Sequence, residues 1–149
     1  MPYVYRAEIE IDASAERVWS VLVDFPSYDA WNPFTVSMRS SLEVGAPVDM
    51  RVRMSRWGIT ISQREILREL TAPTEHSPGR LVWGATMPGI VAERVQMVTP
   101  LARDRTHYLT EDTIGGSLSG LCDLLFGRSL DDGFRSVAER LAERVAALG

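Results

Sequence analysis

Two carboxylates and one phenol in the second half of the chain are the side chains whose types and spacing best suit acid–base chemistry. Glu93 lies in an alternating segment with Val95 and Met97, and Asp112 lies in another with Tyr108. Because alternate residues of a strand share a face, we expect Glu93, Asp112 and Tyr108 to point toward the interior. A carboxyl group in apolar surroundings has a raised pKa, which suits it to proton transfer or to binding a ligand hydroxyl.

The same carboxyl groups also have a purely structural interpretation. Acidic side chains near strand ends often reach solvent or pair with arginine, and Arg64, Arg68 and Arg94 are available as partners. We favour such pairing, so the sequence assigns no catalytic residue and leaves three candidates. They are Asp112, Glu93 and Tyr108.

Nucleophilic and metal chemistry has little support in the sequence. All sixteen basic residues are arginine, which excludes a lysine Schiff base. His76 lies in a loop and His107 is expected to face outward, so we predict no metal site. Cys122 is expected to be a small buried residue, although a position near a helix start would also lower the pKa of its thiol.

Length, composition and charge define the class of protein. A chain of 149 residues with 45% apolar residues is expected to form one domain, residues 1–149. Its net charge of −4 and its lack of a basic run argue against a nucleic-acid partner. No apolar run approaches the roughly 18 residues of a membrane span, and Arg6, Glu8 and Glu10 make the start unlike a signal peptide. We therefore expect a cytoplasmic protein without stable membrane insertion and without a cofactor.

The last stretch of the chain, Ser117 to Leu148, is predicted to be one long helix with Ser117 as its N-cap. Apolar residues three or four positions apart form one face of this helix. They are Leu130, Phe134, Val137, Leu141, Val145 and Leu148. The first half, with Leu121, Leu124 and Leu125, is apolar nearly all round. That half could cover an opening, form a homodimer contact or touch a membrane, and the acidic net charge disfavours the membrane.

Segments rich in Val, Ile, Thr and aromatic residues precede this helix and are separated by glycine and proline. They predict strands over residues 3–11, 34–39, 48–55, 59–70, 80–87, 90–99 and 105–114, and short helices over 15–24 and 28–32. Asp12 and Ser14 can cap the first of these helices. Such short turns join antiparallel strands, and the pairing of the first and last strands stays open. In the strand over 59–70 we expect a bulge near residues 63–65 and leave the inward parity open.

The segments IEIDASAERVW (9–19), WNPF (31–34) and PGRLVW (78–83), together with Gly133-Phe134 in the last helix, carry a family resemblance. They resemble the START/Bet v 1-like superfamily, in its polyketide cyclase/dehydrase and lipid-transport group. The likeness covers essentially the whole chain. It implies an α+β helix-grip fold, in which a seven-stranded curved antiparallel sheet wraps around a long C-terminal helix and two short helices follow the first strand.

The resemblance also implies a cavity between sheet and helix that holds a small hydrophobic ligand, such as a lipid, a polyketide or an aromatic compound. Methionine adapts to varied apolar shapes and suits such a cavity, although it fills an ordinary core equally well. The residues expected to contact the ligand are Trp31, Phe34, Met50, Met54, Trp83, Met97, Tyr108, Asp112, Leu125 and Phe134.

Three functions remain open at this point. Binding or carriage of a hydrophobic ligand leads, because no inward set of acid, base and nucleophile can be assembled. The second is an enzyme resembling aromatase/cyclases, in which Asp112, Glu93 or Tyr108 would move protons. The third is a protein-interaction domain with a collapsed cavity, in which the patch from Leu121 to Phe126 docks a partner protein.

Overall fold

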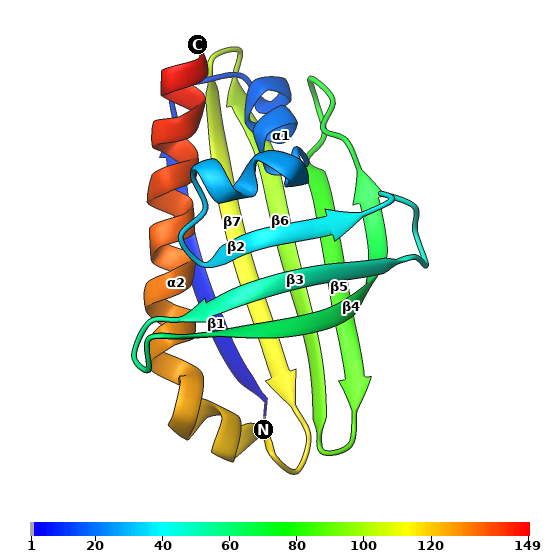
Figure 1. The fold of residues 1–149 in the computed structure, drawn as a ribbon. Helices are drawn as coiled ribbons and strands as arrows, with labels where there is room; N and C mark the ends of the chain where they lie inside the picture. The colour runs from blue at the N-terminus through cyan, green and yellow to red at the C-terminus, as the bar shows by residue number, and fades with distance from the viewer. Residues whose placement is uncertain (1) are drawn as a thin grey trace.

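The computed structural model describes residues 2–149, and its elements follow the predicted order (Figure 1). The strands are β1 (Tyr3–Ile11), β2 (Thr35–Ser40), β3 (Pro47–Met54), β4 (Ile59–Thr71), β5 (Gly79–Met87), β6 (Ile90–Ala102) and β7 (Arg105–Gly115). The helices are α1 (Ala15–Leu22), the short 3-10 helix η1 (Phe25–Ala30) and the long α2 (Ser119–Leu148). The predicted α+β class and helix-grip architecture are confirmed.

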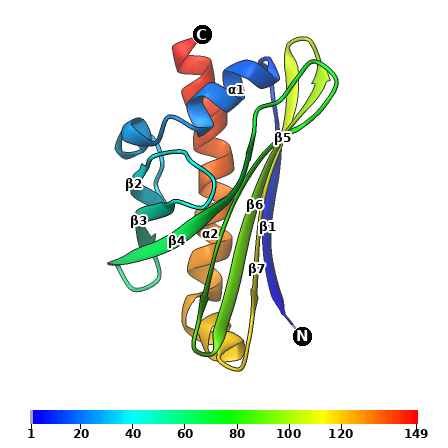
Figure 2. The same ribbon diagram turned by 90° about the vertical axis from the view of Figure 1, so that its right-hand side faces the viewer.

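The strands form one antiparallel sheet in the order β1-β7-β6-β5-β4-β3-β2. Consecutive strands from β2 to β7 are neighbours, as expected for connections too short for a parallel crossover. The pairing left open by the sequence is antiparallel as well, because β1 lies beside β7 with Tyr3 opposite Ile114. The sheet curls around α2, so that β2 and β3 lie on one side of the helix and β1, β5, β6 and β7 lie on the other (Figure 2).

A serine and a proline shape the connection that follows β1. Ser14 Oγ accepts a hydrogen bond from the backbone amide of Arg17 at 3.3 Å, so Ser14 caps α1 as predicted. The helix ends at Leu22, earlier than predicted, and η1 also begins earlier because Pro26 suits its first turn. The phenol of Tyr28 donates a hydrogen bond to the Leu22 carbonyl, which ties the two helices together.

The start of α2 is set by glycines, and the predicted Ser117 cap is wrong. Leu118 occupies the N-cap position and makes no side-chain capping bond. Gly116 has a φ of 101° and packs so closely on the backbone of Gly89 that a Cβ there would overlap it. The Leu118 amide donates to the Gly89 carbonyl at 2.9 Å. This close approach joins the start of α2 to the turn between β5 and β6.

The rest of α2 buries one face against the sheet, as its apolar spacing predicts. The large apolar residues buried on this face are Leu130, Phe134, Val137, Leu141 and Val145. Leu148, which was predicted to join them, is 61% exposed at the end of the helix. Gly133 lies where the Phe34 ring packs on the helix, and a Cβ at this position would overlap the ring. Within residues 2–149, no helix combines the length and the apolar content that crossing a membrane requires.

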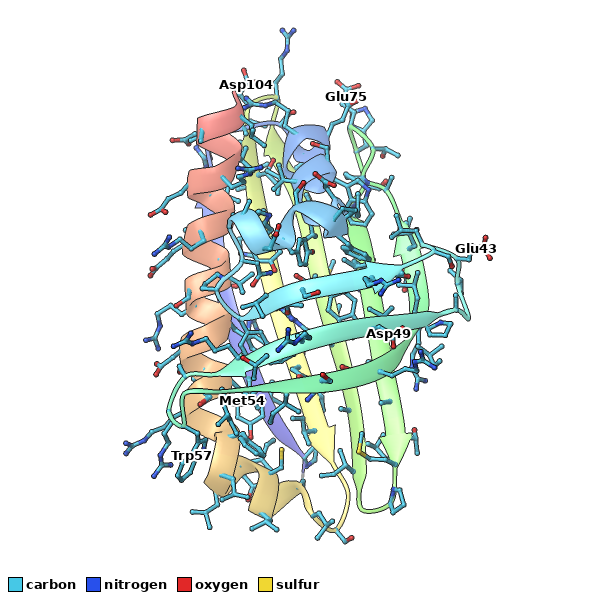
Figure 3. The ribbon with its side chains drawn as sticks, in the orientation of Figure 1. Glu43, Asp49, Met54, Trp57, Glu75 and Asp104 are labelled. Carbon is cyan, nitrogen blue, oxygen red and sulfur yellow. The ribbon has the colours of Figure 1, made fainter. Side chains whose placement is uncertain are left out.

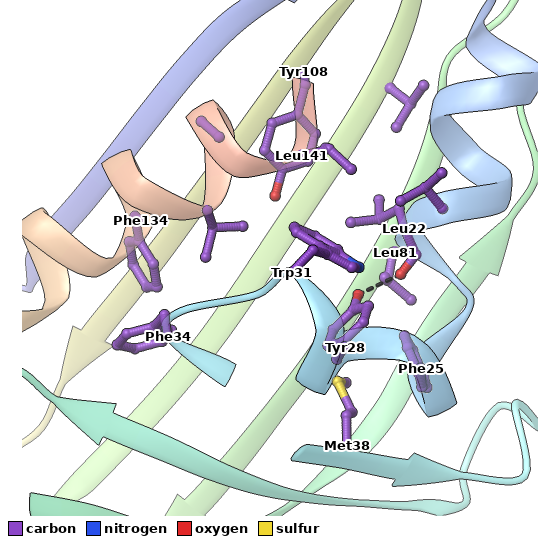
Figure 4. Packing of buried hydrophobic residues seen from close by; sticks show 14 of the residues in the cluster. Leu22, Phe25, Tyr28, Trp31, Phe34, Met38, Leu81, Tyr108, Phe134 and Leu141 are labelled. Atoms are coloured by element: carbon purple, nitrogen blue, oxygen red, sulfur yellow. Dashed lines mark hydrogen bonds between the residues drawn. The ribbon is translucent and has the colours of Figure 1, made fainter. Parts of the chain in front are cut away.

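Aromatic side chains fill the interior between α2, η1 and the middle of the sheet (Figure 4). Phe34 and Phe134 pack edge to face with 5.1 Å between their ring centroids. Trp31, Trp83 and Tyr108 are also buried in this cluster. This part of the interior is therefore a packed core.

Candidate functional site

A row of side chains crosses the inner face of the sheet, the face that packs toward α2. The strand register places Tyr5 opposite Asp112, and Asp112 opposite Arg94. Arg94 in turn lies opposite Trp83. Directly opposite residues in an antiparallel sheet point to the same side, so these side chains share the inner face. Glu65 joins them from β4, because the residue two positions after it is paired with Trp83.

Arg94 is a buried cation held by aromatic rings. Its residue is only 5% exposed, and its guanidinium carbon lies 4.4 Å from the Phe134 ring centroid and 5.4 Å from that of Trp83. Its Nε donates a hydrogen bond to Thr110 Oγ1 at 3.0 Å. The ring faces and the hydroxyl fix the guanidinium in place, so a positive charge stands permanently beside the inner carboxyl groups.

Asp112 and Glu65 carry carboxyl groups whose pKa values lie near neutrality. Burial raises the pKa of Asp112 to about 6, against the opposing effect of the Arg94 charge. Burial also raises the pKa of Glu65 to about 7, and the charge of Asp112 adds to this rise while Arg94 and Arg68 oppose it. Among residues 2–149, the buried Oδ1 of Asp112 has no hydrogen-bond partner. A buried polar oxygen without a partner is costly, and the same holds for Trp31 Nε1 and Thr35 Oγ1, which lie in the core away from the inner carboxyl groups.

The inner face becomes accessible toward the end of the molecule that holds the β5–β6 turn and the start of α2. Trp83 is 1% exposed, whereas Asp112, Glu65 and Ala92 are partly exposed. Met87, which follows Trp83 on the same face of β5, is 50% exposed. The inner site is defined here by six residues around this accessible part of the face. They are Glu65, Ala92, Arg94, Asp112, Cys122 and Phe126.

Two of the three acid–base candidates lie on the inner face, and the third does not. Asp112 points inward as predicted and belongs to the inner site. Tyr108 also points inward, but its hydroxyl donates to Gln96 Oε1 within the fully buried core, and burial raises its pKa. Glu93 is exposed on the outer face, so the predicted inward orientation of Glu93 is wrong.

On β6, the set of residues predicted to face inward is shifted by one position from the set that does so in the structure. Met87 pairs with Ile90 across the two-residue turn between β5 and β6, which places the even-numbered residues of β6 on the inner face. Glu93 and Met97 therefore point outward, because a shift by one position moves every side chain to the other face. The sulfur of Met97 lies 3.5 Å from Arg80 Nη1 on that outer face, so Met97 is removed from the ligand-contacting set.

The other predicted ligand contacts divide between the core and the surface. Trp31, Phe34, Trp83, Phe134, Met50 and Met54 are buried in the core cluster. Leu125 is 36% exposed, and its backbone carbonyl accepts a hydrogen bond from Trp57 Nε1 at 2.6 Å. Leu125 therefore lies partly in solvent, and its contact with a ligand stays a prediction. Ligand contact by the core residues stays a prediction.

Glu65 was missed by the sequence reasoning, and Arg94 was given only the role of a pairing partner. Glu65 lies in the strand whose inward parity the sequence leaves open, and its bulge falls between Leu67 and Glu69, later than predicted. A usable signal was present in the β3–β4 hairpin. Counting back along both strands from its tip places Glu65 opposite Val48, a fully buried residue.

The remaining reactive side chains lie outside any cluster suited to metal binding. His107 points outward with its Nε2 3.2 Å from Glu8 Oε2, and His76 is exposed in a loop, as expected. Burial raises the pKa of the half-buried Cys122 thiol, so the expected alternative of a lowered pKa is wrong. Across residues 2–149, no three His, Cys, Asp or Glu side chains are placed to hold a metal ion together.

The surface also carries hollows away from the inner site. One groove of about 1320 Å³ runs between α1, the loop after β4 and the turn between β6 and β7. Its lining includes Trp19, Pro73, His76 and Arg103, and no residue of the inner site borders it. This groove is an alternative location for a ligand, so a binding experiment has to distinguish it from the inner site.

A curled antiparallel sheet that grips one long helix and carries charged groups on its inner face defines a helix-grip domain of the START/Bet v 1-like class. The chain belongs to the family described as polyketide cyclase/dehydrase and lipid transport, whose model matches residues 4–146. No curated protein matches the sequence significantly.

Solved structures with this fold are similar over nearly the whole chain. A START superfamily protein from Mycobacterium smegmatis is 20% identical with a TM-score of 0.70, and the match covers 98% of this chain and 99% of that chain. A protein from Thermus thermophilus is 18% identical with a TM-score of 0.74 and 99% coverage of both chains. Norcoclaurine synthase from Thalictrum flavum, solved as a point mutant with a transition state analogue, is 14% identical with a TM-score of 0.71, covering 99% of this chain and 96% of that chain.

Proposed function

We propose that this protein binds a small hydrophobic molecule at the inner site and that a polar group of the molecule bonds to Asp112 and Glu65. The unpartnered, buried Oδ1 of Asp112 carries the proposal. A ligand hydroxyl or N–H that donates to this oxygen would supply the missing hydrogen bond. Such a bond contributes more binding free energy at a charged, buried acceptor than at the surface. The family description, which includes lipid transport, supports a hydrophobic ligand.

The surroundings of the two carboxyl groups fit a ligand that is mostly apolar. Ala92 lies opposite Ala85 on one side and Ile114 on the other, all on the inner face. Phe126 of α2 is partly buried against the same cluster. An apolar wall with a few fixed polar groups is the usual composition of a small-molecule site, in which the polar groups set orientation and specificity.

A fluorescence titration with N-phenylnaphthylamine, a neutral apolar probe with one N–H donor, tests this function. Ala92→Trp places a large side chain on the inner face, and we expect it to weaken probe binding at least about tenfold by removing contact area. Val95→Trp, on the outer face of the same strand, is the matched control and should bind like the wild-type protein. Circular dichroism checks that both variants are folded.

Equal probe affinity in the wild-type protein and in both tryptophan variants would contradict binding at the inner site. Loss of binding in Val95→Trp but not in Ala92→Trp would do the same, because it would place the probe on the outer face. If the probe does not bind to the wild-type protein, the proposal is contradicted for molecules of this class.

A cyclase-like enzyme is the second candidate, and the paired carboxyl groups with pKa values of about 6 and about 7 favour it. Near neutral pH, one ionised carboxylate can remove a proton from the carbon next to a carbonyl group while the other, protonated, returns one. The fixed charge of Arg94 would stabilise the enolate oxygen formed in between. The likeness to norcoclaurine synthase is compatible with an enzyme but shows only the fold.

Exchange of the α-protons of benzoylacetone in heavy water, followed by proton NMR, tests the second candidate. An enzyme of this kind accelerates the exchange, and Glu65→Gln or Asp112→Asn should each reduce the acceleration by about 100-fold, the usual contribution of a general acid or base. Exposed Glu93→Gln is the control and should leave the rate unchanged. An exchange rate that neither inner-site variant alters rules this chemistry out for these carboxyl groups.

A further inference from the structure

Most of the large apolar side chains that are exposed to solvent lie at one end of the molecule. Among residues 2–149, fifteen large apolar residues are exposed to solvent, and ten of them lie in residues 3–4, 57–59, 87–91 and 118–125. These segments meet in space: the Leu118 amide binds the Gly89 carbonyl, and Trp57 Nε1 binds the Leu125 carbonyl. In Figure 1 the N-terminus, the β5–β6 turn and the start of α2 lie together at this end. We call these residues the apolar end.

The apolar end carries almost none of the negative charge of the protein. Residues 2–5, 55–59, 87–91 and 117–128 contain one of the twenty acidic residues, Asp123, and two of the sixteen arginines, Arg56 and Arg128. Asp123 is already engaged, because its Oδ1 accepts a hydrogen bond from the Tyr5 hydroxyl at 2.7 Å. Acidic residues such as Glu75 and Asp104 lie at the opposite end (Figure 3). These segments therefore carry a formal charge of +1, and the rest of the chain carries −5.

A tryptophan and two arginines stand at the border of the exposed leucines. The Arg56 guanidinium carbon lies 5.0 Å from the Trp57 ring centroid, and Arg56 Nη1 donates to the Leu124 carbonyl at 3.4 Å. Arg128 follows Leu124 by four positions on the same side of α2. Figure 3 shows Trp57 beside the first turns of this helix. Tryptophan and arginine at the edge of an apolar surface are typical of the zone where lipid headgroups meet acyl chains.

We propose that the apolar end docks on the surface of a lipid bilayer that contains anionic lipids. Leu121 and Leu124, which are 52% and 69% exposed, enter the boundary between headgroups and acyl chains, and Arg56 and Arg128 contact lipid phosphates. The acidic remainder of the surface is repelled by the same membrane, which orients the molecule with this end down. The protein lies on the bilayer without crossing it.

Charge favours a bilayer over a second copy of the chain. A symmetric dimer formed through the apolar end would bring the same surface patch of two copies together. Arg56 and Arg128 would then meet arginines, and Asp123, the acidic residue within the segments of this end, is held by Tyr5. An anionic lipid surface supplies the negative charge that a second copy lacks.

The apolar end also adjoins the accessible part of the inner face, since Met87 lies on both. An apolar ligand could therefore pass between the bilayer and the inner site without crossing water. This passage rests on the proposed function, whereas the docking itself does not.

Co-sedimentation with vesicles tests the docking, using phosphatidylcholine alone and phosphatidylcholine mixed with phosphatidylglycerol. We expect the wild-type protein to sediment with the mixed vesicles, and Leu121→Ser/Leu124→Ser to reduce the bound fraction at least about tenfold through lost apolar burial. Val44→Ser/Leu148→Ser removes equally exposed apolar residues elsewhere and should bind like the wild-type protein. Arg56→Gln/Arg128→Gln should weaken binding to the mixed vesicles and reduce its dependence on salt.

Wild-type protein that stays in the supernatant with both kinds of vesicle would overturn the proposal. A dimer detected by light scattering without lipid, and abolished by Leu121→Ser/Leu124→Ser, would also overturn it in favour of a second copy as the occupant. Ala92→Trp separates this proposal from the proposed function: we expect the variant to bind mixed vesicles normally even where it no longer binds the apolar probe.

Discussion

At the scale of single residues, the carboxyl group of Asp112 stands where its charged form is unfavourable. Burial raises its pKa to about 6, which means that desolvation outweighs the attraction of the Arg94 charge. A group whose pKa is higher in the folded state contributes stability that is fully present below its unfolded pKa and is lost as pH rises through its folded pKa. Such a residue weakens the fold at neutral pH, which is typical of a site kept for function.

Asp112→Asn should therefore stabilise the protein, and more so at high pH. Because the pKa rises from 3.8 to about 6, the variant should gain about 2 kcal/mol more in the free energy of unfolding at pH 8 than at pH 4. Urea denaturation at the two pH values measures this difference. A variant that is destabilised at pH 8, and less so at pH 4, would show instead that the ionised carboxylate is a favourable partner of Arg94.

Asp49→Asn is the matched control, for which we expect the opposite effect on the free energy of unfolding. Asp49 is exposed and accepts hydrogen bonds from Arg64 at 2.6 and 3.0 Å, which lowers the pKa of its carboxyl. A lowered pKa contributes stability above the unfolded pKa and loses it as pH falls through the folded pKa. The Asn variant should thus be slightly less stable than the wild-type protein at pH 8, and the difference should shrink in acid.

Simple alternation along a strand predicted the orientation of some side chains correctly and of others wrongly. Asp112 was placed inward correctly from simple alternation with Tyr108. Glu93 was placed wrongly because both faces of β6 carry apolar residues, so alternation alone does not choose between them. The two-residue turn at Pro88–Gly89 fixes the register, since it pairs the residues on either side of it and leads to Trp83 opposite Arg94.

At the scale of elements, the fit between α2 and the sheet depends on a glycine. Gly133 lies so close to the Phe34 ring that Gly133→Ala must displace the ring or the helix. We expect this variant to lose up to about 2 kcal/mol of unfolding free energy, because overpacking costs about 1–3 kcal/mol and the gain in helix propensity offsets only about 1 kcal/mol of it. Thermal and urea denaturation both measure the change.

Gly120→Ala in the same helix provides the control. A Cβ at Gly120 would meet only the Tyr3 hydroxyl at 3.6 Å, an ordinary contact distance. Without a clash, the better helix propensity of alanine should raise stability by up to about 1 kcal/mol. If Gly133→Ala stabilised the protein as Gly120→Ala does, the packing of Phe34 on α2 described here would be contradicted.

Element boundaries were predictable where local chemistry alone decides them. The capping serine of α1 and the apolar spacing of α2 follow from neighbouring residues and were correct. The start of α2 was not, because the φ of Gly116 is imposed by the backbone of Gly89, far away in sequence. Contacts of this kind arise from the folded sheet, so no local pattern around Ser117 reveals them.

At the scale of the whole molecule, the two halves of the interior differ in what they hold. Aromatic residues pack solidly around Phe134 and Tyr108 near α1 and η1. Toward the apolar end, the same face carries Asp112, Glu65 and Arg94 with partial exposure of the carboxyl residues. The curved sheet and its helix followed from strand signals, helix spacing and family resemblance. The division of the interior into an aromatic part and a charged part did not follow from these signals, because it depends on which residues meet across strands that are distant in sequence.

Binding at the inner site is tested most directly by a proton–nitrogen NMR titration of the assigned wild-type protein with N-phenylnaphthylamine. Binding at the inner site predicts that the largest amide shifts occur around Ala92 and Asp112 in the sheet and around Cys122 in α2. Shifts confined to the groove around Trp19 and His76, or to the exposed Leu121 and Leu124, would contradict it.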